Sequence, residues 1–267
     1  RNGGRPAVRL NGIELSESAN SRPARRAATP TLAGMATLGD LLCRRAEQSP
    51  GKTACRFLNE RGESEVTLTY QALLERASGI ARRLAGHRDQ RVLLLLPPGV
   101  DYLTGFFACM LSGAVAVPLY PPRRNSSGDR VLSAAADCGA VAAVSLRAVH
   151  EHAAAEAQTA VREWIYIEDC EESAPLPESR RRSEDLAFLQ YTSGSVGMPN
   201  GVMVSHANLL SNLDAIARFS RQTSDSRGFS WLPPYHDMGL IGGILFPLYA
   251  GFPVDLMSPQ AFLRSPQ

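Results

Sequence analysis

The segment 92–119 limits the fold of this chain more than any other stretch of the sequence. Residues 92–96 are all apolar and are followed by two prolines and a glycine, a pattern typical of a short strand that is buried on both faces. An almost wholly apolar helix, which we expect Asp101 to cap, then leads to a second apolar strand at 115–119. Parallel strands joined by a helix form a right-handed βαβ unit, so we predict an α/β protein with a mainly parallel sheet flanked by helices.

The same alternation continues on both sides of this unit. Apolar positions at helical spacing predict helices over 38–48, 70–85, 130–138 and 150–163, and a further one capped by Ser205. Extended patterns predict strands over 54–58, 65–68, 141–144, 164–167 and 229–232. Asp129, Arg130 and the polar loop around them could face a substrate, but exposed loop charges are usually solvated, so we interpret these residues and the arginines at 180–182 as solvated surface charges. We interpret His206 as a surface or capping residue.

Three parts of the chain differ in composition. Residues 1–34 contain six arginines, scattered prolines and glycines and no periodicity, which predicts a flexible linker or tail. Residues 35–184 carry the βαβ pattern and are interpreted as a first α/β subdomain. An acidic, proline-rich link precedes residue 185, and we interpret 185–267 as the incomplete start of a second α/β subdomain.

The composition excludes several classes of function. The formal net charge is +2 and the tail carries an excess of arginine, so the folded part is nearly neutral, which argues against nucleic-acid binding. No apolar run is long enough for a membrane span, and the start lacks the apolar core of a signal peptide, so we expect a cytoplasmic location. The five cysteines are scattered without metal-ligand spacing, and we predict no metal site within the chain.

The stretch 187–204 carries the strongest indication of chemistry. Residues 187–191 and 202–204 predict two strands, joined by a loop of glycines and hydroxyl side chains. Glycines let successive main-chain N–H groups turn inward around an anion, so we predict a phosphate loop rather than a plain surface turn. The nucleotide loop GxxxxGK(S/T) is excluded, because its spacing and its lysine are absent. The candidate phosphate-binding residues are Thr192, Ser193, Gly194, Ser195, Val196, Gly197, Asn200 and Gly201.

A second unusual motif occupies residues 231–243. A double proline ends the strand 229–232, so the next side chains project from a strand end, where open α/β sheets bind their ligands. His236 is the sharpest single candidate for contact with a substrate. The glycines and apolar residues beyond it fit two accounts, tight helix packing and the wall of a channel for an alkyl chain. The candidates for acyl and adenylate binding are Tyr235, His236, Asp237, Met238, Gly239, Gly242 and Gly243.

Both motifs resemble those of the adenylate-forming superfamily, which contains acyl-CoA synthetases, luciferases and nonribosomal peptide adenylation domains. Residues 191–201 are similar to its phosphate loop, usually YTSGSTGxPKG, and residues 231–243, 185–190 and 115–122 resemble fatty acyl-AMP ligases. The resemblance extends over about 38–266 and implies the first part of the large N-terminal domain of that fold. It also implies that ATP activates a fatty acid to acyl-AMP. The acyl group would then pass to the phosphopantetheine of an acyl carrier protein in a polyketide, nonribosomal peptide or lipid pathway.

The resemblance implies roles for residues both inside and outside this chain. The histidine at 236 would lie against the acyl carboxylate and the adenylate and position them. The magnesium-binding glutamate and the catalytic lysine of the family would lie beyond Gln267, so the Mg²⁺ ligand is expected there and no catalytic residue is assigned within the chain. We therefore expect an N-terminal fragment that is inactive alone.

Two residues depart from the usual loop. Val196 stands where threonine is usual, and Asn200 where lysine is usual. Losing one charged donor to phosphate removes about 1.5–3 kcal/mol, or about 10- to 100-fold in affinity or rate. These departures keep a degenerate, non-catalytic paralogue that acts as a binding module open as an alternative. A coenzyme A ligase or an amino-acid adenylation domain is the other alternative.

Overall fold

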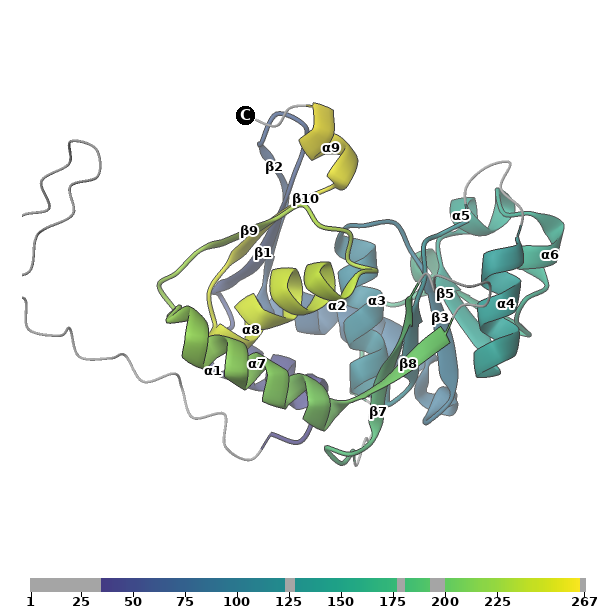
Figure 1. Ribbon diagram of the computed structural model, residues 1–267, viewed down its shortest axis with the longest axis horizontal. Helices are drawn as coiled ribbons and strands as arrows, with labels where there is room; N and C mark the ends of the chain where they lie inside the picture. The colour runs from purple at the N-terminus through teal and green to yellow at the C-terminus, as the bar shows by residue number, and fades with distance from the viewer. Residues whose placement is uncertain (1–34, 123–127, 177–180, 193–199, 265–267) are drawn as a thin grey trace, which may run out of the picture.

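The computed structural model describes residues 35–122, 128–176, 181–192 and 200–264 of the 267-residue chain. These residues form two β-sheets with helices packed on and between them (Figure 1). The predicted linker 1–34 and the candidate loop residues Ser193, Gly194, Ser195, Val196 and Gly197 lie outside the described residues.

The elements follow one another in the order of their numbers. The strands are β1 (Thr53–Leu58), β2 (Ser64–Thr69), β3 (Arg91–Leu95), β4 (Val115–Pro118), β5 (Ala142–Ser145), β6 (Glu163–Tyr166), β7 (Leu186–Thr192), β8 (Asn200–Ser205), β9 (Gly228–Ser230) and β10 (Val254–Met257). The α-helices are α1 (Leu38–Gln48), α2 (Tyr70–Arg83), α3 (Val100–Ser112), α4 (Asp129–Cys138), α5 (Arg147–Glu151), α6 (Ala155–Gln158), α7 (His206–Ser220), α8 (Phe246–Ala250) and α9 (Pro259–Arg264). Short 3₁₀ turns η1 (Ala85–His87) and η2 (Ile167–Asp169) and the π-helix η3 (Met238–Leu245) complete the described elements.

The larger sheet confirms the predicted α/β fold. Its strand order is β6-β5-β3-β4-β7-β8, and every neighbouring pair is parallel except β7 and β8. Strands β3 and β4 lie side by side with α3 between them in the sequence, which is the βαβ unit expected from 92–119. The antiparallel hairpin of β7 and β8 brackets the predicted phosphate loop.

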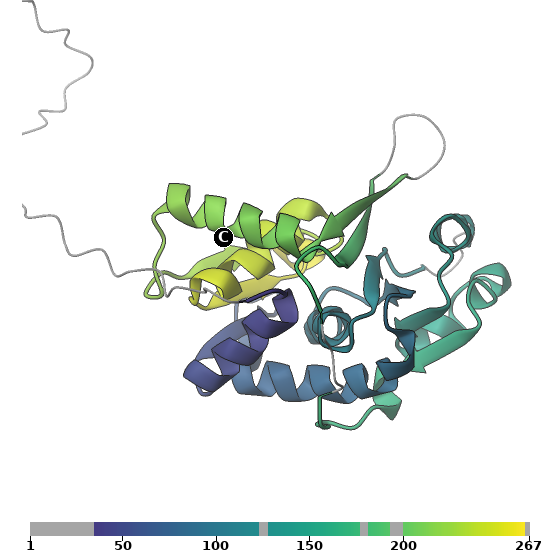
Figure 2. The same ribbon diagram turned by 90° about the horizontal axis from the view of Figure 1, so that it is seen from below.

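The central strand β3 is buried on both faces. Val92 and Leu94 pack into the core cluster that holds α1, α2 and α3, whereas Leu93 and Leu95 pack into the cluster that holds α4. Figure 2 shows α3 almost end-on on one side of this sheet and α4 on the other. Helices on both faces explain why β3 is continuously apolar instead of alternating.

The smaller sheet combines strands from the beginning and from the end of the described chain. Its strand order is β2-β1-β10-β9, with β1 parallel to β10 and antiparallel to β2. The Nε atom of Arg56 on β1 lies 2.6 Å from a carboxylate oxygen of Asp255 on β10, and the Nε atom of Arg227 lies 3.1 Å from the other oxygen. Figure 1 shows β1, β2 and β10 standing at the top of the molecule beside α9.

Two local predictions are wrong. The helix expected over 150–163 is replaced by the short helices α5 and α6, because the segment folds back on itself: Gln158 donates through Nε2 to the carbonyl oxygens of His150 and Ala153, at 3.2 and 3.0 Å. Asp101 does not cap α3, since the N-cap residue is Gly99. Asp101 lies in the first turn, where a negative charge favours the helix dipole.

Both sheets combine strands from either side of residue 184. Strands β7 and β8 extend the sheet of β3 to β6, and β9 and β10 extend the sheet of β1 and β2. The division into subdomains 35–184 and 185–267 does not coincide with the division into sheets, and it stays a prediction. Among the helices of the described residues, none has the length and apolar character that a membrane crossing requires.

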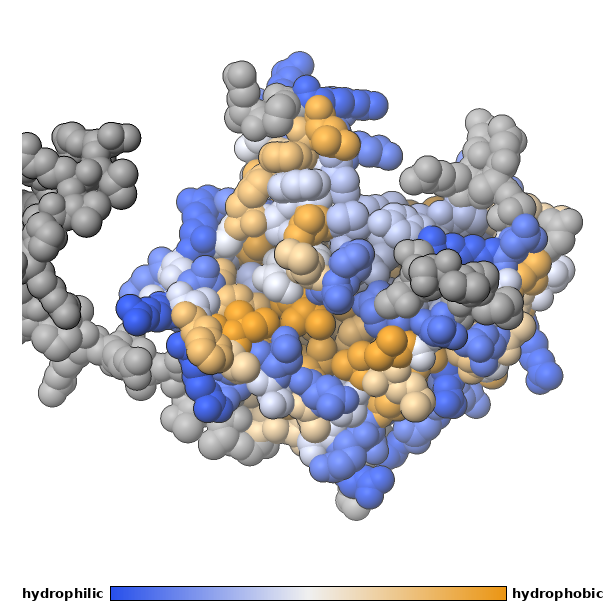
Figure 3. Space-filling view, viewed as in Figure 1, coloured by the Kyte–Doolittle hydropathy of each residue, from blue (hydrophilic) through white to orange (hydrophobic). Residues whose placement is uncertain are grey.

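One face of the molecule carries exposed apolar side chains. Figure 3 shows them gathered across the middle of the face on which η3 and β8 lie. Val202 and Met203 of β8 and Met238 of η3 are among the large apolar residues that are exposed. The apolar area reaches the second motif, because Met238 directly follows Asp237.

Candidate functional site

A cavity of about 230 Å³ lies at the carboxyl ends of β4 and β7. This is the edge of a parallel sheet at which α/β proteins bind their ligands. The cavity brings together residues of the two sequence motifs and of the segment between β4 and α4. Its lining residues are Pro118, Leu119, Tyr120, Arg130, Gln190, Tyr191, Tyr235, His236 and Asp237.

Tyr235 fixes the second motif to the core. Its hydroxyl donates a 2.6 Å hydrogen bond to the carbonyl oxygen of Leu96, directly after β3. Gln190 on β7 donates through Nε2 to the carbonyl oxygen of Tyr235 at 2.8 Å. Burial raises the pKa of the Tyr235 hydroxyl well above its usual range, so the group stays protonated. Tyr235 therefore orients the turn that carries His236.

Aromatic rings complete the support of this turn. The ring of Tyr102 meets the Tyr235 ring edge-on, with centroids 5.2 Å apart, and the ring of Tyr120 lies 4.4 Å away. Tyr102 donates through its hydroxyl to the carbonyl oxygen of Pro234 at 2.7 Å. The strand predicted over 229–232 ends earlier, at Ser230 of β9, so these contacts hold the turn around the double proline and not the end of the strand itself.

His236 and Asp237 are exposed beside the cavity. The Nδ1 atom of His236 lies 2.5 Å from Oδ1 of Asp237, and that oxygen also accepts a 2.7 Å hydrogen bond from the main-chain N–H of Met238. The carboxylate therefore holds both the imidazole ring and the first residue of η3. This arrangement suits a histidine that positions a substrate through a fixed ring.

The β7–β8 hairpin places the ends of the predicted phosphate loop beside the same cavity. Thr192 pairs with Asn200, and Tyr191 pairs with Gly201. A Cβ atom on Gly201 would lie 3.0 Å from the Tyr191 ring, so this glycine makes room for the ring as well as for the turn. The assignment of Thr192, Asn200 and Gly201 to phosphate binding stays a prediction.

The glycines of the second motif divide into two kinds. A Cβ on Gly239 would lie 2.1 Å from the carbonyl oxygen of Pro233, and one on Gly243 would lie 2.6 Å from Oγ of Ser230. These two glycines allow tight packing. A Cβ on Gly242 would meet nothing within 4 Å. Gly242 is therefore the member of this set that suits the wall of a substrate channel.

A second, smaller cavity lies between the two sheets. Its volume of about 30 Å³ has room for about two water molecules but not for an alkyl chain. Its lining residues are Phe57, Pro98, Gly99, Tyr102, Ser230, Leu232, Pro234, Ile244, Leu256, Met257 and Ser258. The channel for an alkyl chain that the second motif suggested is therefore not open at this small cavity.

A comparison with protein-family models gives one match, to the AMP-binding enzyme family, over residues 42–267. The chain belongs to the AMP-binding enzyme family. Relatives of the chain include the medium-chain-fatty-acid–[acyl-carrier-protein] ligase JamA of Moorena producens, which is 35% identical over 249 residues, 86% of this chain and 41% of the relative. The long-chain-fatty-acid–AMP ligase FadD26 of Mycobacterium tuberculosis is 35% identical over 243 residues, 85% of this chain and 41% of the relative.

Solved structures agree with this family. The fatty acyl-adenylate ligase of L. pneumophila, solved in complex with acyl adenylate and pyrophosphate, is 38% identical with a TM-score of 0.77. The match covers 86% of this chain and 41% of that structure. The resemblance to fatty acyl-AMP ligases in the sequence is thus confirmed, and the AMP-binding chain spans about 41% of the length of these relatives.

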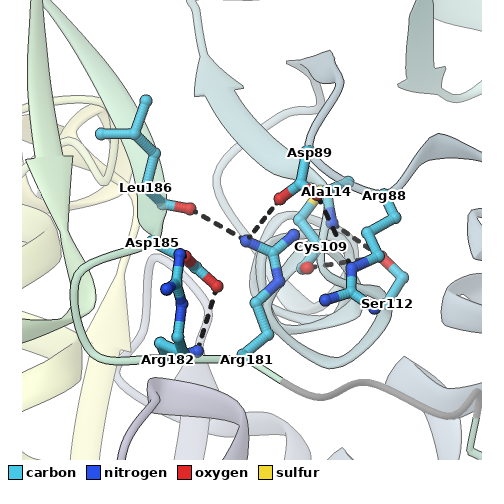
Figure 4. A network of polar contacts seen from close by, with 9 residues as sticks. All are labelled: Arg88, Asp89, Cys109, Ser112, Ala114, Arg181, Arg182, Asp185 and Leu186. Carbon is cyan, nitrogen blue, oxygen red and sulfur yellow. Dashed lines mark hydrogen bonds and ion pairs between the residues drawn. The ribbon is translucent and has the colours of Figure 1, made fainter.

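Arg181 contradicts the prediction of a solvated charge, and His206, predicted as a surface or capping residue, does not lie at the surface. Arg181 is 3% exposed, and Nη1 lies 3.5 Å from a carboxylate oxygen of Asp89 and donates to the carbonyl oxygen of Leu186 at 3.4 Å (Figure 4). His206 is buried, and its Nδ1 atom accepts a 3.3 Å hydrogen bond from the N–H of Leu38 at the start of α1. Arg181 contacts the first residue of β7, and the cavity lies at the other end of that strand.

The described residues contain no cluster of three or more His, Cys, Asp or Glu that could hold a metal ion. The expectation that the Mg²⁺ ligand lies beyond Gln267 stays a prediction. Sequence reasoning did not assign Tyr120 and Gln190 to the cavity, and it interpreted Arg130 as solvated. Tyr120 and Gln190 do lie in the segments 115–122 and 185–190 that resemble fatty acyl-AMP ligases, and Arg130 lies at the start of α4.

Proposed function

We propose that the protein containing this chain uses ATP to activate a fatty acid as acyl-AMP. The observation that carries the proposal is the single cavity bounded by Tyr191, where the predicted phosphate loop begins, and by His236 of the second motif. A nucleotide phosphate and an acyl carboxylate must meet in this reaction, and the two motifs assigned to them meet in the structure. The names of the ligases to which the chain is similar support a fatty acid as the substrate.

In the proposed reaction, a carboxylate oxygen of the fatty acid attacks the α-phosphorus of ATP. The bond from this phosphorus to the bridging oxygen breaks, and pyrophosphate leaves with the electron pair. Because both reactants are anions, the site must supply positive charge and hold the two groups in line. His236, held by Asp237, would position the carboxylate, and the main-chain N–H groups of the loop would hold phosphate. The described residues contain no group of three or more His, Cys, Asp or Glu placed to hold a metal ion, and no step is assigned to Mg²⁺.

The acyl acceptor in this proposal is the phosphopantetheine thiol of an acyl carrier protein. The name of JamA, a ligase to acyl carrier protein, supports this acceptor. Coenzyme A is the alternative, because the putative fatty-acid–CoA ligase FadD21 of Mycobacterium tuberculosis is also 35% identical, over 253 residues. We place the reaction in the cytoplasm, where ATP and the carrier protein are available.

The test uses the complete protein. Exchange of labelled pyrophosphate into ATP is measured with fatty acids of increasing length and with a panel of amino acids. Exchange that depends on a fatty acid supports the proposal, whereas exchange that depends on an amino acid replaces it with the adenylation-domain alternative. Transfer of labelled acyl groups to a holo carrier protein rather than to coenzyme A decides the acceptor. Absence of exchange together with absence of ATP binding in calorimetry would establish the non-catalytic binding module.

A further inference from the structure

Among the described residues that line the cavity, Arg130 is the one that carries a guanidinium. The sequence interpretation allowed that Arg130 could face a substrate but favoured a solvated surface charge, and the residue is exposed at the start of α4. We infer that Arg130 binds and orients the anionic reacting group of a substrate in this cavity, a phosphate or a carboxylate. This inference rests on the proposed function for the identity of the substrates, but the anion site itself is a separate claim.

Helix α4 is fixed with one face toward β7. The hydroxyl of Tyr191 donates to Oδ2 of Asp137 at 2.5 Å and lies 3.3 Å from the carbonyl oxygen of Ala134. Arg130, Ala134 and Asp137 are four and then three residues apart, a spacing that places all three on the same face of a helix. The contacts of Tyr191 hold the C-terminal half of α4. Because Arg130 lies on the same helix face in the first turn, these contacts direct it toward the cavity.

The guanidinium of Arg130 rests on an aromatic ring. Its Cζ atom lies 5.7 Å from the centre of the Tyr120 ring, which in turn lies 4.4 Å from the Tyr235 ring. A guanidinium that contacts an aromatic face in this way keeps N–H groups that can bind an anion. Among the described residues, Arg130 forms no ion pair with a carboxylate, so its charge stays available.

Arg147 shows the contrasting arrangement. Its Cζ atom lies 4.5 Å from the centre of the Tyr166 ring, but its Nη2 atom also lies 2.5 Å from a carboxylate oxygen of Asp169. The charge of Arg147 is therefore neutralised by a neighbour, and this residue does not line the cavity. Each arginine contacts an aromatic ring, but only Arg147 of these two also forms an ion pair with a carboxylate.

A positive charge in this cavity would help to bring the two anionic reactants together. The residue at the position of the usual loop lysine is the neutral Asn200, at the start of β8. Two anions must still be brought together, and each charged donor that binds phosphate or carboxylate contributes about 10- to 100-fold in affinity or rate. Arg130 supplies such a donor from a different element of the fold.

The test compares Arg130→Gln, Arg130→Lys and the matched control Arg147→Gln in the complete protein. Arg130→Gln is expected to lower kcat/KM for exchange about 10- to 100-fold, Arg130→Lys to restore part of it, and Arg147→Gln to stay within about twofold of the wild type. A rise in the KM for ATP identifies phosphate as the bound group, and a rise in the KM for fatty acid identifies carboxylate. Wild-type kinetics in Arg130→Gln, or equal losses in both glutamine variants, would overturn the inference.

A binding measurement separates this inference from the proposed function. If the wild-type protein shows no exchange, the proposed function fails, and calorimetric titrations with pyrophosphate and with octanoate decide the anion site instead. Binding of either probe that is at least about tenfold weaker in Arg130→Gln, with Arg147→Gln unchanged, supports the site. Equal affinity in wild type and Arg130→Gln, or no binding of either probe, rejects it.

Discussion

The Nε atom of Arg45 donates a 2.9 Å hydrogen bond to the main-chain carbonyl oxygen of Leu248, 203 residues further along the chain. Its Nη2 atom donates to the next carbonyl oxygen, that of Tyr249, so a buried guanidinium satisfies two carbonyls in the last turn of α8. Arg45→Met removes both donors and leaves the two carbonyls unsatisfied. We expect the free energy of unfolding to fall by about 3 kcal/mol.

Urea unfolding followed by circular dichroism measures this loss. The matched control is Arg82→Met, in an exposed position of α2, for which we expect a change within about 0.5 kcal/mol. Equal midpoints for Arg45→Met and the wild type would show that the link between α1 and α8 contributes nothing to stability.

The glycines of η3 provide a matched pair of substitutions. Gly239→Ala places a methyl group 2.1 Å from the carbonyl oxygen of Pro233, a main-chain atom that cannot move away cheaply, and should cost about 3 kcal/mol. Gly242→Ala meets nothing within 4 Å and should leave stability within about 1 kcal/mol of the wild type, on the stabilising side. Thermal unfolding of both variants checks the difference. If Gly242→Ala were the less stable of the two, Gly242 would not face open space.

His206 predicts a dependence of stability on pH. Burial, and to a smaller extent the charge of Arg181, lowers the pKa of His206 from its ordinary 6.5 to about 4, although Asp185 and Asp40 act in the opposite direction. Between these two values the unfolded chain binds more protons than the folded one, so folding loses stability as the pH falls from 6.5 to 4. The free energy of unfolding should therefore fall by about 3 kcal/mol through His206 as the pH falls from 6.5 to 4, and the full stability from this residue is present only above pH 6.5.

The measurement is the difference in urea midpoint between pH 7 and pH 4.5 for the wild type and for His206→Asn, whose side-chain oxygen can still accept from Leu38. The variant should lose less stability on acidification than the wild type. His152→Asn, at an exposed position after α5, should respond to pH as the wild type does. Identical pH profiles for His206→Asn and the wild type would mean that the imidazole is not buried in its neutral form.

The two departures from the usual phosphate loop predict a gain of activity. Val196→Thr combined with Asn200→Lys restores a hydroxyl and a charged donor, and we expect pyrophosphate exchange in the complete protein to rise at least about tenfold. Gln48→Lys adds the same charge at an exposed position of α1, so it serves as the control. An unchanged exchange rate in the double variant would mean that these positions do not limit the reaction.

Local patterns in the sequence predicted most of the larger sheet. The strand β3 and helix α3 were recognisable because burial on every side requires continuous apolar residues. The hairpin of β1 and β2 and the helix α4 were placed within two residues of their ends, since their turn signals and helical spacing are local. The predictions for these elements need no knowledge of distant contacts.

Contacts between distant residues could not be predicted from one sequence. Arg181 stands in a polar segment that reads as a solvated loop, and its burial depends on Gly113, where a Cβ atom would lie 2.5 Å from the guanidinium Nε atom. The role of Arg130 depends likewise on Tyr120 and Tyr235, which approach each other only in the folded chain. The two motifs indicated the candidate site, and the residues that connect them were visible only in the structure.

The pairing of β1 with β10 has a consequence for synthesis of the protein. Arg56 and Asp255, which face each other on these strands, are 199 residues apart. At about 5–20 residues per second, a ribosome needs about 10–40 s to deliver the second strand after the first. The hydrogen-bonding edge of β1 stays open during that time, and an open strand edge invites association with other nascent chains. Slow translation or scarce chaperones should therefore reduce the yield of folded protein through association of nascent chains, independently of the stability of the folded state.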